Sequence, residues 1–162
     1  MKTIYVVRHA RAHAKGIYLS DAERTLTDAG RQDARQIGKM LRDKNTVPDL
    51  ILSSTAKRAL ETAYILADEM HYSRAKIDMR QSLYDIKFED LLNILSGLDD
   101  RYQSVMFVGH NPPMSTMSDY LTQYGVGNLA PGSVFCCEFK VDTWKAISKY
   151  GGICKFLEVP KN

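Results

Sequence analysis

Residues 3–10 read TIYVVRHA, and this stretch decides the fold that we expect. Its first five residues, 3–7, form a short, uninterrupted run rich in β-branched side chains, which is typical of a buried strand. The run ends at Arg8 and His9, so two polar side chains follow the strand directly. In open α/β sheets, ligands bind outside the carboxyl ends of the strands. The stretch therefore predicts a buried strand with a candidate functional site at its end.

Further apolar runs and helical patterns follow along the chain. Buried strands are expected at residues 50–52 and 105–108. Four helices are expected. The first is capped by Thr27 and ends near Asp43, and the second is capped by Ser54 or Thr55 and ends near Met70. A short helix covers residues 88–95, and the last begins at Pro112 or Pro113 and ends near Tyr124. This alternation of strand and helix predicts a largely parallel sheet with helices on both faces.

The last third of the chain has strand patterns without helices between them. They cover residues 134–141, 144–147 and 153–159, and we expect them to add antiparallel strands at the edge of the sheet. No internal repeat, low-complexity tract or Gly/Ser linker divides the sequence. The expected fold is therefore one α/β domain over residues 1–162, with a mostly parallel sheet, helices on both faces and antiparallel edge strands from the C-terminal third.

Composition excludes several classes of function. With 44% hydrophobic and 25% charged residues, the chain resembles an ordinary soluble protein. Its net charge of +3 is too mild for a nucleic-acid-binding protein. No apolar run approaches the roughly 18 residues that span a bilayer, and the N-terminus lacks the apolar segment of a secretory signal. We therefore expect a cytoplasmic protein that binds neither nucleic acid nor membrane. We also expect a monomer, because no helix has an uncommitted apolar face.

Cysteine usage fits a reducing compartment. An odd count of three cysteines argues against a disulfide framework, and no CxxC spacing suggests a metal site. Cys136 and Cys137 are adjacent in a strand pattern, so one of the two is expected to point inward as a small hydrophobic side chain. The four histidines have no CxxC partner, and we expect no zinc site.

Polar signatures follow each of the first three predicted strands. The first strand ends in Arg8 and His9; the second leads through two serines into a helix whose first turn carries Arg58; the third ends at His110 within GHN, residues 109–111. The carboxyl ends of parallel strands share one edge of the sheet, so two arginines and two histidines should meet in one crevice. Neighbouring helix starts add N–H donors. These residues together predict a site for a dianion.

Three motifs in this order resemble the histidine phosphatase (phosphoglycerate mutase-like) superfamily. They are RHA at residues 8–10, SSTAKRALETA at 53–63 and GHN at 109–111. Within this superfamily the chain is similar to the short SixA-type phosphohistidine phosphatases, which carry a stretch like DAERTLTDAGRQDA, residues 21–34, after the first motif. The resemblance covers about residues 1–124. It implies an enzyme without a cofactor or metal, in which His9 is the nucleophile and Arg8, Arg58 and His110 bind the phosphoryl group.

The chemistry of these residue types agrees with the implied roles. A histidine attacks phosphorus only while one ring nitrogen is unprotonated, and a backbone carbonyl on the other nitrogen would fix that tautomer. Arginine offers a planar fork of donors that matches two phosphoryl oxygens. His110, if protonated, would donate another charge-assisted hydrogen bond. Phosphoryl transfer depends mainly on positioning and charge stabilisation, so cations from the protein can suffice.

Departures from the family pattern concern the turn residues and the acid. Ala10 stands where glycine is common, and Thr55 stands where proline is usual. Larger members of the family use a glutamate as proton donor, whereas SixA-type proteins lack an obvious acid. The nearest candidate here is Asp85, with Glu89 one turn further on; alternatively, Asp85 only shapes a turn.

This gap bears on the substrate. An alkoxide leaving group needs a proton, whereas a phosphoramidate can already be protonated on its leaving nitrogen. The chain also has no long insertion between Met70 and Tyr102 that could cover the crevice. An open site with a weak acid suits phosphohistidine displayed on a partner protein, or a related phosphoramidate.

Other polar residues have more than one interpretation. Arg24 is expected to pair with Asp21, although it could reach the phosphate. Arg11 and Lys15 would either contact a protein substrate or lie in solvent. Thr62, one helical turn after Arg58, is expected to orient the Arg58 side chain, and two histidines are expected at the surface: His13 and His71.

The main hypothesis is a metal-independent phosphatase that works through a phosphohistidine on His9. One alternative is a small-molecule phosphoester hydrolase or mutase, which would need a clear acid and a lid. Another is a non-catalytic phosphate-recognition module. The presence of both His9 and His110 argues against this module, because binding alone needs the arginines but not a nucleophile.

Overall fold

The computed structural model describes residues 1–16 and 20–161, and these form a six-stranded sheet with the strand order β3-β2-β4-β1-β5-β6. The strands are β1 (Lys2–Arg8), β2 (Leu50–Ser54), β3 (Asp78–Arg80), β4 (Ser104–Gly109), β5 (Val134–Phe139) and β6 (Ile153–Glu158). The strands from β3 to β1 are parallel, and β5 and β6 are antiparallel to their neighbours. The mostly parallel sheet with antiparallel strands from the C-terminal third is confirmed. The short strand β3 was not predicted.

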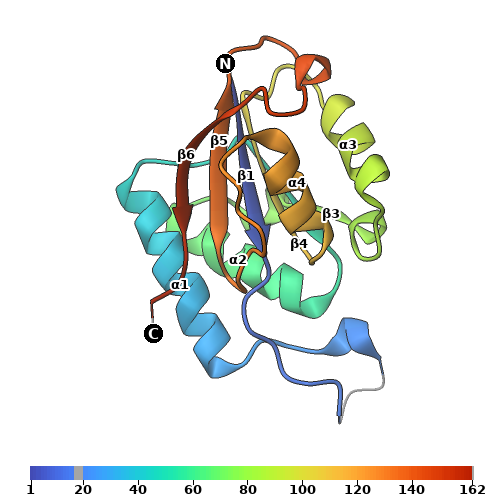
Figure 1. The fold of residues 1–162 in the computed structure, drawn as a ribbon. Coiled ribbons are helices and arrows are strands. Elements are labelled where there is room, and N and C mark those ends of the chain that lie inside the picture. Colours follow the sequence, from blue (N-terminus) through green and yellow to red (C-terminus); the bar gives the residue numbers. More distant parts are fainter. Residues whose placement is uncertain (17–19, 162) are drawn as a thin grey trace.

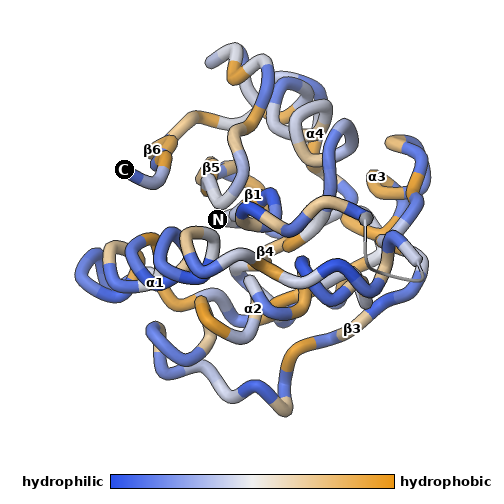
Figure 2. Tube along the Cα trace, turned by 90° about the horizontal axis from the view of Figure 1, so that it is seen from below, coloured by the Kyte–Doolittle hydropathy of each residue, from blue (hydrophilic) through white to orange (hydrophobic). Residues whose placement is uncertain are grey.

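Helices cover both faces of this sheet, as expected (Figures 1 and 2). The α-helices are α1 (Asp28–Asp43), α2 (Lys57–Met70), α3 (Phe88–Ser96) and α4 (Pro113–Leu121). Short 3-10 helices are η1 (Asp21–Glu23), η2 (Arg74–Lys76), η3 (Gln81–Leu83) and η4 (Trp144–Ala146). Helices α1 and α2 pack on one face and α3 and α4 on the other. No helix of the described residues is both long and apolar enough to cross a bilayer.

Alternate side chains of the central strands fill two separate cores. Along β1, Ile4 and Val6 pack with α3 and α4, whereas Tyr5 and Val7 pack with α1 and α2. The period of two explains why the central strands are apolar throughout. The prediction that only one of two adjacent cysteines points inward was wrong. Cys136 and Cys137 are both buried, on opposite faces, because β5 is covered on both sides.

Most predicted boundaries hold, with some corrections. The Thr27 hydroxyl caps α1 by accepting from the Gly30 amide at 3.0 Å, as predicted. The N-cap of α2 is Ala56, not Ser54 or Thr55, because the Ser54 hydroxyl serves the Ala56 amide from within the preceding strand segment. Helix α4 ends at Leu121 rather than near residue 124.

The strand predicted at residues 144–147 is the 3-10 helix η4. Its alternation of apolar residues has another cause: Trp144 is fully buried, with its indole N–H donating to the Asp99 carbonyl at 3.2 Å. The Asp100 carboxylate accepts from the Trp144 amide at 2.9 Å. These contacts hold the segment as a turn and do not pair it with a strand of the sheet.

Register aligns the ends of the central strands. Arg8 of β1 pairs with Gly109 of β4, and Ser53 of β2 pairs with Val108 of β4. The carboxyl ends of these three strands therefore lie side by side. The residues that follow them share one edge of the sheet.

Candidate active site

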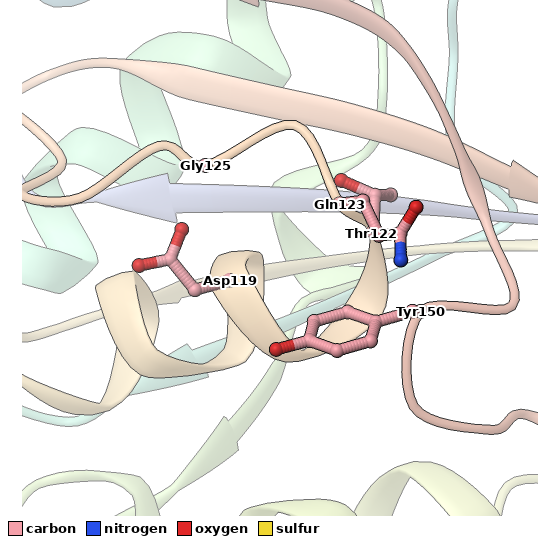
Figure 3. A pocket seen from close by; sticks show the side chains of 5 residues that line it. All are labelled: Asp119, Thr122, Gln123, Gly125 and Tyr150. Atoms are coloured by element: carbon pink, nitrogen blue, oxygen red, sulfur yellow. The ribbon is translucent and has the colours of Figure 1, made fainter.

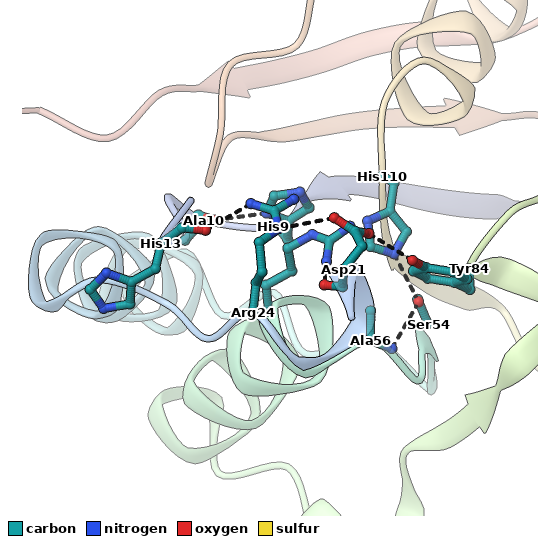
Figure 4. Close-up of polar contacts among 10 residues, drawn as sticks. His9, Ala10, His13, Asp21, Arg24, Ser54, Ala56, Tyr84 and His110 are labelled. Carbon is teal, nitrogen blue, oxygen red and sulfur yellow. Dashed lines mark hydrogen bonds and ion pairs between the residues drawn. The ribbon is translucent and has the colours of Figure 1, made fainter. Parts of the chain in front are cut away.

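The two histidines predicted to act together lie side by side at this edge. The His9 amide donates to the Gly109 carbonyl at 3.0 Å, which ties the end of β1 to the end of β4. The ring centroids of His9 and His110 are 5.3 Å apart (Figure 4). The alignment of the strands thus brings two residues that are 101 positions apart in sequence next to each other.

One ring nitrogen of His9 is committed to the backbone. Nδ1 lies 2.8 Å from the Ala10 carbonyl oxygen, which can only accept, so Nδ1 carries the proton. Nε2 then has a lone pair. Burial lowers the pKa of His9 to about 4, and the charges of Arg58 and Arg8 act in the same direction. The imidazole is therefore neutral near pH 7, in the form that a nucleophile requires.

His110 is buried beside Ser54. Its Nε2 lies 2.8 Å from the Ser54 hydroxyl, which accepts from the Ala56 amide and so has its own proton available for Nε2. In that arrangement the proton of His110 resides on Nδ1. Burial lowers the pKa of His110 to about 3, with His9 and Arg58 adding to the effect. Without an anion the ring is neutral, and it can donate from Nδ1 without being protonated.

The two predicted arginines approach from different elements. Arg8, at the end of β1, donates from Nη1 to the Leu129 carbonyl at 3.0 Å, and burial lowers its pKa. Arg58, in the first turn of α2, donates from Nη1 to the Asp21 carbonyl and from Nη2 to the Asp21 carboxylate, both at 2.8 Å. Neither arginine uses Nε in a hydrogen bond with the described residues.

Unsatisfied buried polar atoms concentrate at this site. Within the described residues, the buried side-chain atoms without a hydrogen-bond partner are Arg8 Nε, Arg58 Nε, His110 Nδ1 and Ser133 Oγ. Three of these four belong to the residues predicted to bind a phosphoryl group. A buried donor left without a partner costs about 1–3 kcal/mol, so this set has a reason to exist only if something accepts from it. An oxyanion would.

Asp21 connects several of these residues. Its carboxylate accepts from Tyr84 Oη at 2.6 Å and from Arg24 Nε at 2.9 Å, in addition to Arg58 (Figure 4). The Arg24–Asp21 ion pair was predicted and is confirmed. The Tyr84 hydroxyl and then Arg58 hold the pKa of Asp21 well below its usual range. Tyr84 was missed by the sequence reasoning; only its place beside Asp85 drew attention to that region.

Thr62 has a different role from the one predicted. Its hydroxyl donates to the backbone carbonyl of Arg58 at 2.7 Å and accepts from the Ala10 amide at 3.0 Å. Neither of these hydrogen bonds involves the Arg58 side chain. Thr62 instead holds the main chain directly after His9, because a threonine in a helix satisfies its hydroxyl on the carbonyl four residues earlier.

A loop from the last third of the chain closes the site beside Arg8. The Gly132 amide donates to the carbonyls of Arg8 and His9, both at 3.0 Å. Asn111 donates to the same Leu129 carbonyl that accepts from Arg8, at 3.1 Å. Gly132 has φ +78°, which favours glycine. The motifs gave no signal for this loop, because its backbone, not its side chains, makes the contacts.

The candidate acid Asp85 and the remaining basic residues considered in the sequence analysis are exposed. Asp85 is exposed and makes no hydrogen bond or ion pair within the described part of the chain. Arg11 is exposed and pairs with Asp33 at 2.8 Å. Lys15 is exposed. His13 and His71 are exposed as well, as predicted.

A cavity of about 610 Å³ opens beside His9. Its lining contains three guanidinium groups and small apolar side chains: Arg8, His9, Arg11, Ala12, Arg24, Thr27, Ala29 and Pro131. A hollow of about 600 Å³ beside the last turn of α4 has neither histidine nor arginine; its lining is Asp119, Thr122, Gln123, Gly125 and Tyr150 (Figure 3). The chemistry therefore points to the first cavity. Among the described residues, no three or more His, Cys, Asp or Glu residues gather as a metal site would require.

Solved structures show the same fold. The structure of a protein from Agrobacterium tumefaciens, described as a SixA phosphohistidine phosphatase, superimposes with a TM-score of 0.82 at 24% identity, covering 98% of each chain. The protein histidine phosphatase SixA complexed with tungstate gives 0.82 at 17% identity, covering 98% of this chain and 97% of the other. At these identities the likeness establishes the fold.

Curated relatives match only part of their length. An uncharacterised chloroplastic protein of Arabidopsis thaliana is 29% identical over 118 residues, which is 68% of this chain and 54% of that protein. A 2,3-bisphosphoglycerate-dependent phosphoglycerate mutase of Arthrobacter sp. (strain FB24) is 34% identical over 61 residues, which is 38% of this chain and 25% of the mutase. The chain thus spans about half of the first relative and about a quarter of the second.

The sequence model of the Histidine phosphatase superfamily (branch 1) matches residues 4–96, more than half of the chain. This range carries the first two motifs, and the third lies beyond it. With the SixA-type fold and the two histidines brought together at the strand ends, the match identifies the chain as a member of the histidine phosphatase superfamily.

Proposed function

We propose that this protein is a phosphatase that transfers a phosphoryl group to His9 and then to water. Nε2 of His9 attacks phosphorus, the bond from phosphorus to the leaving group breaks, and a phosphohistidine forms. Water then attacks the same phosphorus, releasing inorganic phosphate and restoring the imidazole. The observation that carries the proposal is the set of buried, unpartnered donors beside a His9 ring whose Nε2 lone pair is available.

Arg8, Arg58 and His110 would bind the phosphoryl oxygens in this reaction. Their unpartnered atoms are two guanidinium Nε–H groups and one imidazole nitrogen, and all are buried. Preorganised donors in a site of this kind stabilise the charge that spreads over the equatorial oxygens of the transferring group. We infer that the two guanidinium cations, with the neutral His110 as a further donor, serve in place of a metal.

The preferred substrate is a phosphohistidine on a partner protein or a related phosphoramidate. Asp21, which contacts Arg58, is held ionised by its hydrogen bonds and so cannot give a proton. Asp85 is exposed and makes no hydrogen bond or ion pair with the residues that the structure describes. A leaving nitrogen that already carries its proton needs no such acid. The cavity beside His9, with Arg11 and Arg24 in its lining, would receive the leaving group.

Turnover on a substrate panel tests this proposal. The panel contains a phosphohistidine peptide, a phosphoryl-transfer protein phosphorylated on histidine, phosphoglycerates and an aryl phosphate, each with and without a chelator. We expect phosphohistidine and the aryl phosphate to be hydrolysed at rates that the chelator leaves unchanged.

Three results would contradict it. Interconversion of phosphoglycerates as the fastest reaction would make the protein a mutase. Binding of phosphate without any turnover would make it a recognition module. Loss of activity with the chelator and its return with a divalent ion would contradict the metal-free mechanism.

A further inference from the structure

The Asp21 carboxylate joins three segments that are distant in sequence. Asp21 begins η1, in the loop that follows His9; Arg58 lies in the first turn of α2; and Tyr84 follows η3. One oxygen, Oδ2, accepts from both Arg58 Nη2 at 2.8 Å and Tyr84 Oη at 2.6 Å. The other oxygen accepts from Arg24 Nε. Both carboxylate oxygens therefore accept hydrogen bonds from the protein.

The donors of Arg58 that Asp21 holds differ from the donor left without a partner. Asp21 takes Nη1 with its backbone carbonyl and Nη2 with its carboxylate. Nε is buried and has no partner within the described chain. A guanidinium is a rigid plane, so fixing two of its nitrogens fixes the direction in which the third points. Asp21 thus fixes the orientation of the Arg58 guanidinium and leaves its Nε–H without a partner.

Tyr84 extends this arrangement to His110. Its ring stands edge-on to the His110 ring, with centroids 5.6 Å apart and an interplanar angle of 90° (Figure 4). The tyrosine therefore touches the histidine with its ring and the aspartate with its hydroxyl. One side chain contacts His110 directly and Arg58 through Asp21.

We propose that Tyr84 and Asp21 are positioning residues of the phosphoryl pocket, holding Arg58 and His110 so that Arg58 Nε and His110 Nδ1 face the phosphoryl group. The inference rests on the proposed function for the nature of the ligand. It assigns no chemical step to either residue. Both act through the groups that would touch the phosphate.

If Asp21 competed with the phosphoryl group instead of positioning Arg58, weakening its contacts would change the oxyanion affinity in the opposite direction. If the carboxylate competed with phosphate for the cations, weakening its hold on the site would tighten oxyanion binding. If it positions Arg58, the same change weakens binding. Because Arg58 keeps a separate donor unpartnered, the geometry favours positioning.

Tyr84→Phe separates these roles, because it removes the hydroxyl without changing any charge and keeps the ring beside His110. Tungstate binding to the full chain is measured by calorimetry, and kcat and KM are measured with an aryl phosphate. We expect tungstate affinity and kcat/KM each to fall about tenfold, the effect of losing one hydrogen bond to a charged group. The matched control is Tyr72→Phe, whose hydroxyl bonds the Ile51 amide and the Lys76 carbonyl, and it should bind tungstate as the wild type does.

A double-mutant cycle with Arg58→Ala shows whether Tyr84 acts through Arg58. In the Arg58→Ala background, Tyr84→Phe should change kcat/KM much less than it does in the wild type, because the group to be positioned is gone. Unchanged or tighter tungstate binding by Tyr84→Phe would overturn the inference, as would full additivity in the cycle. A wild type that binds no tungstate would instead overturn the proposed function, so the two failures are distinguishable.

Discussion

The two ends of β1 each carry a cationic side chain, fully buried at the amino end and half-buried at the carboxyl end, and the hydrogen-bond donors of the two side chains are satisfied to different extents. At the amino end, Lys2 is fully buried; its Nζ donates to the carbonyls of Asp100 and Tyr102, both at 2.7 Å, and lies 5.0 Å from the centroid of the Trp144 ring. At the carboxyl end, Arg8 has one contact to a carbonyl, and its buried Nε has no partner in the described structure.

Within one strand, Lys2 therefore contributes to the folded structure, whereas Arg8 keeps a donor for a ligand. Burying a charge is costly unless the charge has partners, and at Lys2 two carbonyls and the Trp144 ring surround the ammonium group. A buried donor without an acceptor destabilises the fold until a ligand arrives. Functional sites commonly keep such costs, which the rest of the fold offsets. The predictions below test whether the two ends behave as these contacts indicate.

The largest effect is expected for His9→Ala. Removing the proposed nucleophile should lower kcat by more than about a thousandfold and abolish any phosphoenzyme. Trapping with labelled substrate and an alkaline quench, followed by measurement of protein-bound label, checks this. The fold should remain, as shown by circular dichroism. Wild-type turnover by His9→Ala would refute the assignment.

Arg58→Ala should have the next largest effect. Loss of a preorganised charged donor should lower kcat/KM by about a hundredfold to a thousandfold and weaken tungstate by a similar factor. Steady-state kinetics and calorimetry measure the two quantities. Asp68→Asn is the matched control, because it disrupts another Arg–Asp pair, with Arg74, at an exposed position away from the site. Equal losses in both variants would show that the effect is not specific to the pocket.

The pH dependence of stability should reveal the lowered pKa of His9. Its pKa is about 4 in the folded chain, against an ordinary 6.5, so protonation favours the unfolded state. Its contribution is fully present above about pH 6.5 and is lost as the pH falls through about 4. Urea unfolding at pH 7 and pH 5 should therefore show a larger loss of unfolding free energy for the wild type than for His9→Ala. Equal losses would mean that the pKa of His9 is not lowered in the folded chain.

Lys2→Met tests the other end of β1. The apolar stem is kept while the charged donor is removed, and the carbonyls of Asp100 and Tyr102 lose the Lys2 ammonium as a donor. We expect the free energy of unfolding to fall by about 1–3 kcal/mol, with kcat/KM unchanged. Denaturant titration and steady-state kinetics measure both. A large loss of activity in a folded Lys2→Met variant would show that the two ends are coupled.

The smallest effect is expected for Asp85→Asn. Because Asp85 is exposed and without polar contacts in the described chain, the substitution should change the rates on an alkyl and an aryl phosphate by the same small factor. The ratio of the two rates is the measurement. A selective loss on the alkyl phosphate, of about a hundredfold or more, would establish Asp85 as the proton donor.

Local sequence patterns were enough to predict most of the fold. The features that they did not predict depend on contacts between segments distant in sequence. The strand at residues 3–7 and the cap at Thr27 were predictable because each depends on neighbouring residues. The 3-10 helix at Trp144 was mistaken for a strand because its anchors, Asp99 and Asp100, lie more than 40 residues away.

The site follows the same division. The motifs placed both histidines and both arginines at one edge of the sheet. They gave no indication of Tyr84, which is linked to Asp21 across 63 residues, or of the Leu129 carbonyl, which is linked to Arg8 across 121. Thr62 was located correctly but assigned the wrong partner, because its spacing shows proximity to Arg58 and not which atom it bonds.

The carbonyl of Leu129 and the amide of Gly132 have a consequence for biosynthesis. Arg8 is synthesised 121 residues before Leu129, so the backbone groups that hold Arg8 and His9 belong to a loop made much later. A nascent chain ending before this loop contains both motif histidines but lacks the loop that orients Arg8. Phosphoryl chemistry would thus begin only once synthesis has passed this loop, and the unfinished polypeptide would pass through its exposed stages without an active centre.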